Sequence, residues 1–564
     1  MAKAGHVYPQ AMPRAADLMD ARVTMVRRGW SVDRALAAAR ASGAFTIAAD
    51  LRTAARLADI ERAAAWGLGR LPWVDIAFTG LTAVASSADE ISVRRVLRGG
   101  TSMVLVRDGR RVAGVIEASA RPGASLAGKL ERLHGAEGDA ALWLLRTAGK
   151  LGEAQGHAAY VAGGFVRDLV LGRGAAQTRD IDLVVEGDGI AFGRRLAEET
   201  GGHLVVHTAF GTASLEGGAT PDGTGIGRVD IATARHERYG EAGALPDVSP
   251  AGIDEDLGRR DFSINAMAVA LSPSAWGRLH DPRGGAEDVA ARRLKVLHPL
   301  SLVEDPTRIW RGARYAARLG LRPDAGFRRA LALAIKVGRY PTLSGQRLQA
   351  ELDLVMDEGD PWRALGFLLS WGALRLWDAS YRVTGRSRAR LAAARSLLRW
   401  ARGARIAVDG PGLALFALLF DQSRPVADRC VRRLAIAGGP AARLDAGAAR
   451  DLARRLACLD PRRPSRVAET LRPVPDGLLL GAWLAGGRSV RRDIEWFLHE
   501  GRAERPLSSG DDVVAAGVPR GPLVGQVLGF LRDLKLDGRV RTMDEERAAV
   551  AEWMKVLVTK GDLR

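Results

Sequence analysis

The spacing of apolar residues changes along the chain from a strand-like pattern to a helical one. Thr101 to Val106 and Arg111 to Ile116 are apolar runs separated by an Asp-Gly pair, which is typical of a β-hairpin. Val23 to Val26 and Ala44 to Ala48 are further strand candidates, and they flank a helix predicted over Ser31 to Ala41. After about residue 320, apolar residues recur at intervals of roughly three and four residues. The last part of the chain is therefore predicted to be all-helical.

Length and composition indicate a folded protein with several domains. At roughly 100 to 200 residues per domain, the 564 residues predict about three or four domains. Hydrophobic residues make up 47% of the chain and charged residues 26%, which excludes wholesale disorder. Cys430 and Cys458 are the only cysteines, so a disulfide framework and a thiolate zinc site are excluded. A reducing cytoplasm is the expected location, and the lack of any apolar run of about 18 residues predicts no membrane span.

The formal net charge of +18 favours a polyanionic partner such as nucleic acid, although an arginine-rich coding bias produces the same composition. The position of the charge changes this picture. Eight arginines and no acidic residue occur between Arg382 and Arg405. Arg388, Arg395, Arg399 and Arg402 recur at helical spacing, so this face is predicted to bind RNA phosphates, with a merely solvated basic face as the alternative.

A glycine pair joins a predicted strand to a predicted helix. Tyr160 to Ala162 are apolar, and they are followed by Gly163 and Gly164 and then by Arg167 in the first turn of the helix. Glycines at such a turn let backbone N–H groups approach a phosphate, and the helix N-terminus favours its negative charge. Arg167 is therefore a phosphate-binding candidate, whereas Asp168 can equally be structural.

Two aspartates separated by one residue lead into the next apolar run. Asp180 and Asp182 point to the same face of a strand, about 7 Å apart, where carboxylates suit Mg²⁺. Asp230 lies in a later strand-like segment and is predicted to join them. An isolated pair of this kind is more often two solvated acids, but the upstream glycine turn favours a metal site. This order of parts resembles the nucleotidyltransferases typified by polymerase β, which implies catalysis by Asp180, Asp182 and Asp230 with two metal ions.

Two later motifs make the resemblance more specific. They are Arg259 to Ala268, with the sequence RRDFSINAMA, and Val303 to Arg311, with the sequence VEDPTRIWR. Together with the earlier segments, they make residues 141 to about 320 resemble the class II tRNA nucleotidyltransferase and bacterial poly(A) polymerase family. The resemblance implies a polymerase-β-type head with a mixed sheet, followed by an all-α neck, body and tail.

The second of these motifs also carries an argument from hydrogen bonding. Cytosine and adenine present an amine donor beside a ring-nitrogen acceptor, whereas uracil and guanine present the reverse. One carboxylate and one guanidinium therefore select C and A. Asp305 and Arg308 are such a pair, and at i and i+3 on a predicted helix they share a face, with helix capping by Asp305 as the alternative. The family resemblance assigns base selection to these two positions.

The resemblance also implies roles for residues around this pair. Arg260, Asp261 and Asn265 are the positions that hold the ribose and triphosphate, and Arg311 is a further nucleotide-binding candidate. On one helical face, polar side chains at this spacing can reach a sugar hydroxyl, which favours ribonucleotides. The family needs a flexible loop before this motif to add the final A, and the corresponding segment, residues 233–257, is retained. Addition of A is therefore expected.

The first part of the chain resembles a pair of cystathionine-β-synthase (CBS) domains. The passage Asp59 to Pro72 looks like the segment that joins two such repeats. The family's ribose-binding pattern is degraded, because Arg56 stands where a hydroxyl belongs and the second repeat has Glu117 and Ala120. This favours a structural or dimerising role, and the resemblance implies a homodimer through the pair.

These observations predict a multidomain α+β protein with five parts. The parts are a degenerate CBS pair (residues 1–125), a linker (126–140), a nucleotidyltransferase head (141–270), a nucleotide-selecting neck (271–345) and an all-helical RNA-binding body and tail (346–564).

The predicted function is template-independent addition of CCA, or of its terminal A, to tRNA 3′ ends from CTP and ATP with Mg²⁺. A poly(A) polymerase that uses the same site is the first alternative. An inactive RNA-binding relic regulated by CBS repeats is the second, and the retained Asp180, Asp182, Asp305 and Arg308 argue against it. A DNA polymerase, or an enzyme that modifies a small molecule or protein, is disfavoured by the base-selecting pair and the basic helical region.

Overall fold

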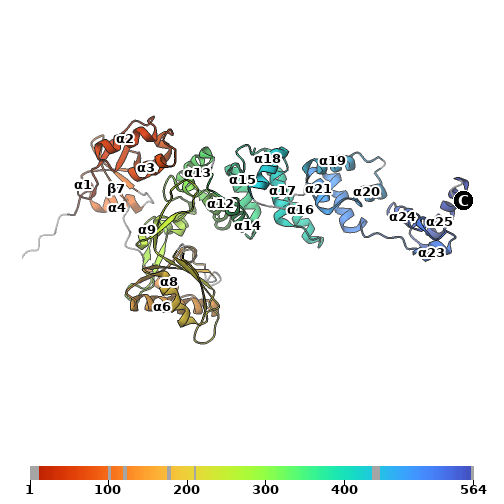
Figure 1. Cartoon of the computed structure of the whole chain (residues 1–564), viewed down its shortest axis with the longest axis horizontal. Coiled ribbons are helices and arrows are strands. Elements are labelled where there is room, and N and C mark those ends of the chain that lie inside the picture. Colours follow the sequence, from red (N-terminus) through yellow and green to blue (C-terminus); the bar gives the residue numbers. More distant parts are fainter. Residues whose placement is uncertain are drawn as a thin grey trace, which may run out of the picture. The chain divides into compact units, whose positions relative to one another are not determined.

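The computed structural model describes residues 12–98, 103–117, 124–173, 180–208, 211–338, 340–434, 445–460 and 462–560. The chain forms two compact units, residues 1–379 and 380–564, which are considered separately here (Figure 1). The first unit holds the N-terminal module, the head and the neck.

The N-terminal module contains the same strand order twice. The first set is β1 (Val23–Met25), α2 (Val32–Ser42), β2 (Thr46–Asp50), β3 (Thr53–Arg56) and α3 (Leu57–Ala65), with β4 (Phe78–Thr79) added at the edge. The second set is β5 (Ala83–Ala85), α4 (Glu90–Arg98), β6 (Met103–Asp108) and β7 (Arg111–Glu117). In each set the first strand pairs with the second in parallel, and the second pairs with the third in antiparallel. Ala120 lies outside the described residues.

The region predicted as a linker is largely helical. It contains α5 (Ala127–Leu130), and α6 (Ala136–Ala154) begins before residue 141, where the head was expected to start. Gly138, Ala140 and Ala141 are buried, so packing of one face of α6 against the head extends the helix. The predicted linker boundary at 140 is therefore wrong, because tertiary packing overrides a charged and glycine-rich local sequence.

The head is built on a seven-stranded mixed sheet with the order β10-β11-β12-β9-β8-β15-β16. Its strands are β8 (Ala158–Ala162), β9 (Asp180–Glu186), β10 (His203–His207), β11 (Thr212–Glu216), β12 (Arg228–Thr233), β15 (Ala268–Ala270) and β16 (Leu279–His280). Helix α6 and helix α8 (Gly189–Thr200) contact each other and the sheet, so they cover one of its faces (Figure 1). Helix α7 (Gly164–Val170) follows β8, and a separate hairpin consists of β13 (Arg235–Arg238) and β14 (Asp247–Pro250).

The neck is mainly helical, but it also contains short strands. Its elements are α10 (Gly285–Ala290), β17 (Arg293–Leu294), α11 (Ser301–Glu304), α12 (Arg308–Leu319), β18 (Arg322–Pro323) and α13 (Ala325–Val337). Helix α9 (Ile253–Gly258) precedes it within the predicted head, and α14 (Gly345–Met356) and α15 (Pro361–Trp371) follow it at the start of the predicted body. β16 extends the head sheet beyond residue 270, and β17 pairs with β18. The prediction of an all-α neck is wrong at these three strands, which are too short to produce a periodic sequence pattern.

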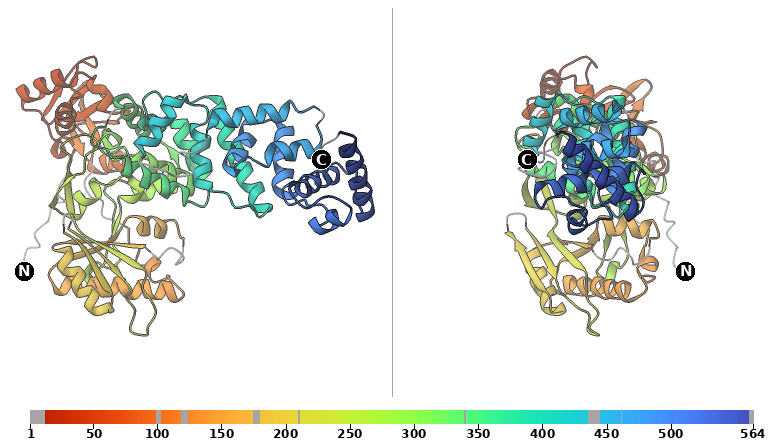
Figure 2. Two further views of the ribbon diagram at one scale, coloured as in Figure 1. Left: turned by 45° about the vertical axis from the view of Figure 1, so that its right-hand side comes forward. Right: turned by 90° about the vertical axis from the view of Figure 1, so that its right-hand side faces the viewer.

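The described residues of the second unit form helices, as predicted (Figure 2). They are α16 (Gly385–Gly403), α17 (Gly410–Leu419), α18 (Arg424–Arg433), α19 (Ala446–Ala457), α20 (Pro464–Leu471), α21 (Asp476–Ala485), α22 (Arg488–Trp496), α23 (Gly510–Ala515), α24 (Pro522–Leu536) and α25 (Met543–Lys560). Among the described residues, no helix is both long and apolar enough to cross a bilayer.

Gly149 tests the packing of α6 against the head. A Cβ at this position would collide with the backbone carbonyl oxygen of Leu271, which cannot move without disturbing the strand region that precedes it. We expect Gly149→Ala to destabilise the first unit by about 3 kcal/mol, as overpacking does. Gly366→Ala in α15 is the matched control, since a Cβ there meets open space, and it should stabilise by about 0.5–1 kcal/mol. Denaturant midpoints of the whole chain measure both, and equal midpoints would contradict the packing.

Candidate active site

A cavity of 690 Å³ lies between the head and the neck within the first unit. Residues from all the predicted motifs reach its wall, namely Gly163, Gly164, Asp182, Asp230, Arg260, Asp261, Asn265, Asp305, Arg308 and Arg311. The volume falls in the range of small-molecule sites, about 300–1,000 Å³. Segments separated by more than a hundred residues in the sequence therefore build one site.

The acidic wall comes from two parallel neighbouring strands. β9 and β12 are in register with Asp182 opposite Asp230, so both carboxylates emerge on one face. The Asp230 carboxylate accepts hydrogen bonds from Ser214 Oγ at 2.6 Å and Arg228 Nε at 3.1 Å. Burial raises the pKa of Asp182, Arg260 lowers it in part, and the negative charges of Asp230 and Asp180 raise it further. The ionised form of Asp182 is thus disfavoured, mainly because the side chain is buried.

Asp180 occupies the first position of β9, where it is exposed and does not line the cavity. Within the described residues, no three His, Cys, Asp or Glu side chains are arranged to hold a metal ion. The predicted convergence of three carboxylates is therefore incomplete, because only two of the three, Asp182 and Asp230, line the cavity. Asp230 is held by Ser214 and Arg228, and mutual repulsion opposes closer approach of the acids.

Gly163 allows the close contacts at the base of the cavity. It precedes α7 with φ of 71°, a conformation that favours glycine. A Cβ at this position would lie 2.9 Å from Asp182 Oδ2 and 3.0 Å from Arg260 Nη1. The absence of a side chain therefore lets Asp182 and Arg260 lie against the turn.

Arg167 does not have the predicted position at the cavity wall. It is 4% exposed, and its guanidinium donates to Asp168 at 2.8 and 3.1 Å and to Asn265 Oδ1 at 2.9 Å. The Asn265 amide in turn donates to Asp261 Oδ1 at 3.0 Å. Arg167 is thus a support for Asn265 and Asp261, and Asp168 is its buried counterion. A basic residue beside a glycine turn looks the same in sequence whether it faces a phosphate or the core.

The motif that begins at Arg259 was predicted to lie on one helix, and this prediction is wrong. α9 ends at Gly258, and only a short 3₁₀ turn, Ser263–Asn265, follows. Arg260 is held by Asp256, whose carboxylate accepts from it at 3.1 Å and also from Arg259 at 2.5 Å. Burial alone would raise the pKa of Asp256, but the two guanidinium groups bring it below its ordinary value.

Asp305 and Arg308 also differ from the helical pair that was predicted. Asp305 ends α11, and α12 begins only at Arg308. Asp305 accepts hydrogen bonds from Thr307 Oγ1 at 2.7 Å, Arg347 Nη2 at 2.9 Å and Arg311 Nη2 at 3.2 Å. Burial raises the pKa of Asp305, but the neighbouring arginines, Arg311 first, lower it below its usual range. Asp305 is therefore an ionised acceptor.

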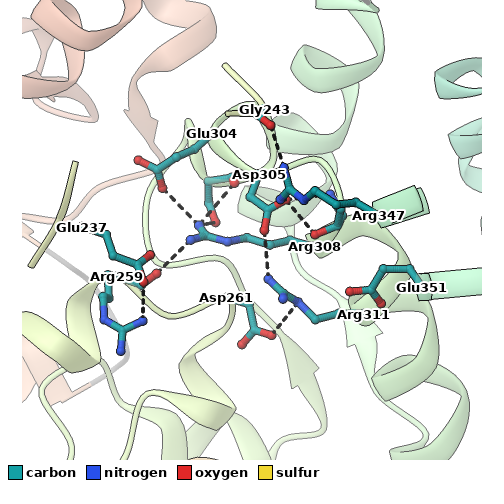
Figure 3. Close-up of polar contacts among 12 residues, drawn as sticks. Glu237, Gly243, Arg259, Asp261, Glu304, Asp305, Arg308, Arg311, Arg347 and Glu351 are labelled. Carbon is teal, nitrogen blue, oxygen red and sulfur yellow. Dashed lines mark hydrogen bonds and ion pairs between the residues drawn. The ribbon is translucent and has the colours of Figure 1, made fainter. Parts of the chain in front are cut away.

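Arg308 is 2% exposed and is bonded on several sides (Figure 3). It donates to Ser301 Oγ at 2.8 Å, to Glu304 Oε2 at 3.2 Å and to the Arg259 carbonyl oxygen at 2.8 Å. A base that bonds to Arg308 must therefore share or replace these contacts. Arg311 bridges Asp261 at 3.3 Å and Asp305 at 3.2 Å, which links the sugar motif to the base-selecting motif.

Comparison with known proteins agrees with this geometry. Residues 159–295 match the model of the poly A polymerase head domain. The A-adding tRNA nucleotidyltransferase of Halalkalibacterium halodurans is 30% identical over 418 residues, which cover 72% of this chain and 90% of that protein. The CC-adding tRNA nucleotidyltransferase of Deinococcus radiodurans is 34% identical over 70% of this chain and 89% of that protein. The chain belongs to the class II tRNA nucleotidyltransferase and poly(A) polymerase family.

A solved structure extends the similarity beyond the head. The Thermotoga maritima CCA-adding enzyme complexed with tRNA matches 77% of this chain and 100% of its own length, with a TM-score of 0.64 and 26% identity. The A-adding relative from Geobacter sulfurreducens, 32% identical over 72% of this chain, is longer, and the match covers 46% of it. The predicted family and the predicted nucleotidyltransferase class are thus confirmed.

Several residues that shape the nucleotidyltransferase cavity were not predicted. Arg347 of α14 donates to Asp305 and, at 2.7 Å, to the Gly243 carbonyl oxygen (Figure 3). Glu237 of β13 accepts from Arg259 Nη1 at 2.7 Å. No local motif marks either residue. Asp256, by contrast, lies three and four residues before two arginines, a spacing that could have indicated ion pairs.

The acidic wall fits a divalent cation. Asp182 carries a raised pKa because it is buried beside other carboxylates, and a cation would offset both effects. Asp182 and Asp230 would hold such an ion. Asp180 is near enough to raise the pKa of Asp182.

Because Asp182 must be ionised to bind a cation, affinity should fall on acidification, and the fall should begin at a higher pH than for an aspartate with the ordinary pKa of 3.8. We expect Asp182→Asn to weaken Mn²⁺ binding at least about tenfold at pH 7, which is about 1.4 kcal/mol, and to flatten the pH dependence. Calorimetric titration with Mn²⁺ from pH 5 to 7.5 measures this. Asp139→Asn, an exposed residue in α6, is the control, and an unchanged Asp182→Asn profile would contradict the assignment.

Proposed function

We propose that this protein adds nucleotides to tRNA 3′ ends without a template, and that its main product is the terminal A. The observation that carries the proposal is the shared cavity, in which Asp182 and Asp230 lie on one wall and Asp305 and Arg308 on another. A site for phosphoryl transfer and a site for choosing the base are thus within reach of one nucleotide. The names of the A-adding relatives support the choice of A.

The segment between the acidic strands and the sugar motif supports A addition further. Residues 233–257, which the family resemblance connects with adding A, include the hairpin β13–β14. Its turn reaches the base-selecting motif, because the Gly243 N–H donates to the Glu304 carbonyl oxygen at 3.0 Å. Leu245 and Pro246 of the same turn line the cavity. The loop is therefore in a position to influence the base that the pair selects.

The chain's own residues account for binding and orientation. Arg260, close to Asp182, is placed for a phosphate, and Asp261 and Asn265 offer polar atoms for the ribose. Asp305 accepts from an exocyclic amine, and Arg308 donates to a ring nitrogen, which suits A and C. Mg²⁺, when bound, would activate the attacking hydroxyl and neutralise charge on the leaving pyrophosphate.

Three tRNA acceptors distinguish the products. They end before CCA, after the first C and after CC, and each is incubated with labelled ATP or CTP and sequenced. We expect ATP label to enter the CC-ended acceptor as one nucleotide. CTP entering the shorter acceptors would mean CCA or CC addition, as the name of the Deinococcus relative suggests. Long A ladders would mean a poly(A) polymerase.

Removal of one carboxylate from the acidic wall tests the site in the same assay. Asp182→Asn should lower the rate by at least about 1,000-fold, because one of the two carboxylates of the acidic wall is lost. Asp139→Asn should leave the rate unchanged, since Asp139 is exposed in the first turn of α6. Equal rates in the two variants would contradict the proposed site.

We also propose that the arginine stripe of α16 binds the tRNA backbone. Arg388, Arg395, Arg399 and Arg402 are all exposed, whereas Leu391, Ala394 and Leu397 of the same helix are buried. Arginines in such a row can follow phosphates, which gives salt-dependent affinity without sequence preference.

Salt dependence tests the stripe. Replacing Arg399 and Arg402 by Gln should weaken tRNA binding and lower the slope of log K against log salt by roughly 1 to 2. The matched control is Arg110→Gln with Arg111→Gln, which removes the same charge from an exposed hairpin of the N-terminal module. The same slope for both double variants would contradict the proposal, because it would show that only the net charge of the protein matters.

We propose that the N-terminal module is a degenerate CBS pair with a structural role. The repeated strand order supports the pair. The positions compared with a ribose site are occupied by ion pairs, since Arg56 Nε lies 2.7 Å from Glu117 and Arg62 Nη2 lies 2.5 Å from Asp59. Calorimetric binding of adenosine or AMP to the module would contradict this role.

A further inference from the structure

Helix α3 of the N-terminal module contacts the cavity wall at two separate points. Arg62 Nη1 donates to Glu304 Oε1 at 2.9 Å, and the indole of Trp66, which follows the helix, donates to the Tyr239 carbonyl oxygen at 3.2 Å. Glu304 immediately precedes Asp305, and Tyr239 lines the cavity. The module therefore reaches both the base-selecting motif and the loop that precedes the sugar motif.

Glu304 joins Arg62 to Arg308. Its Oε1 accepts from Arg62, and its Oε2 accepts from Arg308 at 3.2 Å and lies 3.1 Å from His298 Nε2. Glu304 is 4% exposed. Burial alone would raise the pKa of Glu304, but the contacts with His298, Arg308 and Arg62 lower it to about 2. One ionised carboxylate is thus shared between the N-terminal module and the residue that faces the base.

Arg62 is itself fixed by a second buried acid. Asp59, one turn earlier on α3, is 0% exposed, and its Oδ1 accepts from Arg62 Nη2 at 2.5 Å. The fork of Arg62 therefore spans two carboxylates, one in its own helix and one in the neck. A guanidinium held at both ends has little freedom, so it defines the position of Glu304.

We propose that Arg62 is a positioning residue for nucleotide selection, acting through Glu304 on the guanidinium of Arg308. The inference rests on the proposed function, because it assigns base selection to Arg308. Without Arg62, the Oε1 atom of Glu304 loses its cation, and the carboxylate is free to rotate toward Arg308. Arg308 then bonds more strongly to the protein and is less available to a base.

This role is separable from a general contribution to stability. Arg40 also pairs with α3, through Glu61 at 3.0 Å, but that pair is exposed, with 63% of the Arg40 side chain accessible. Arg40 lies in α2, so Arg40→Met removes an arginine and an ion pair to α3 without touching the cavity, and it is the matched control for Arg62→Met.

The experiment measures nucleotide addition by the whole chain with the acceptor that the wild type extends best. We expect Arg62→Met to lower kcat/KM for the preferred nucleotide about tenfold and to reduce its preference over UTP and GTP about fivefold, with KM for tRNA unchanged. Arg62→Lys keeps a charge near Glu304 and should restore most of the preference. Trp66→Phe, which removes the hydrogen bond to Tyr239 together with part of the ring system, should alter the preference in the same direction by less than Arg62→Met.

The outcomes separate this inference from the proposed function. A wild-type chain that extends no tRNA overturns the proposed function. An active wild type with Arg62→Met equal to Arg40→Met in preference and in kcat/KM overturns only the role of Arg62. If Arg62→Met does not fold, as judged by circular dichroism, Arg62→Gln takes its place, because it also removes the charge beside Glu304. A preference and a kcat/KM equal to those of Arg40→Met then overturn the inference.

Discussion

The site depends on the pairing of buried carboxylates with guanidinium groups that come from distant parts of the chain. Asp305 lies among Arg311 and Arg347, and Asp256 lies between Arg259 and Arg260. Removing one partner of such a pair typically costs about 3–5 kcal/mol, because a buried charge is left uncompensated. The ion pairs therefore hold the head, the loop and the neck in one arrangement around the cavity.

The charges around Asp305 and around Asp182, on the two walls of the cavity, differ in how far the protein itself compensates them. Around Asp305 the positive groups are already supplied, so a base competes with the protein for the same hydrogen bonds. Around Asp182 the carboxylate itself is poorly accommodated, since burial raises its pKa and Asp230 and Asp180 raise it further against the opposing effect of Arg260 and Arg167. A nucleotide with its cation supplies what the second wall lacks. The same physical cause, charge in a poorly solvated cavity, thus underlies both the proposed base choice and the proposed cation binding.

Motifs that act through neighbouring positions were predictable. The Gly163 turn and Asp182 lie where the local pattern placed them, because strand alternation and glycine conformations are properties of a few adjacent residues. Asp180, at the first position of β9, is exposed and lies outside the cavity wall. Arg167 was assigned to phosphate because a short sequence does not reveal which side chains are buried. The helical spacing of Asp305 and Arg308 was also misleading, because α12 starts at Arg308 and Asp305 bonds to side chains far along the chain.

By itself, the sequence determined the family, the nucleotidyltransferase class and the helical second half. Only the tertiary structure decided which of the candidate side chains face the cavity and which support it, and it alone revealed Arg347, Glu237 and the contact of Arg62 with Glu304. The physical reason is that periodicity and turn chemistry are local, whereas a buried ion pair joins residues that become neighbours only after folding.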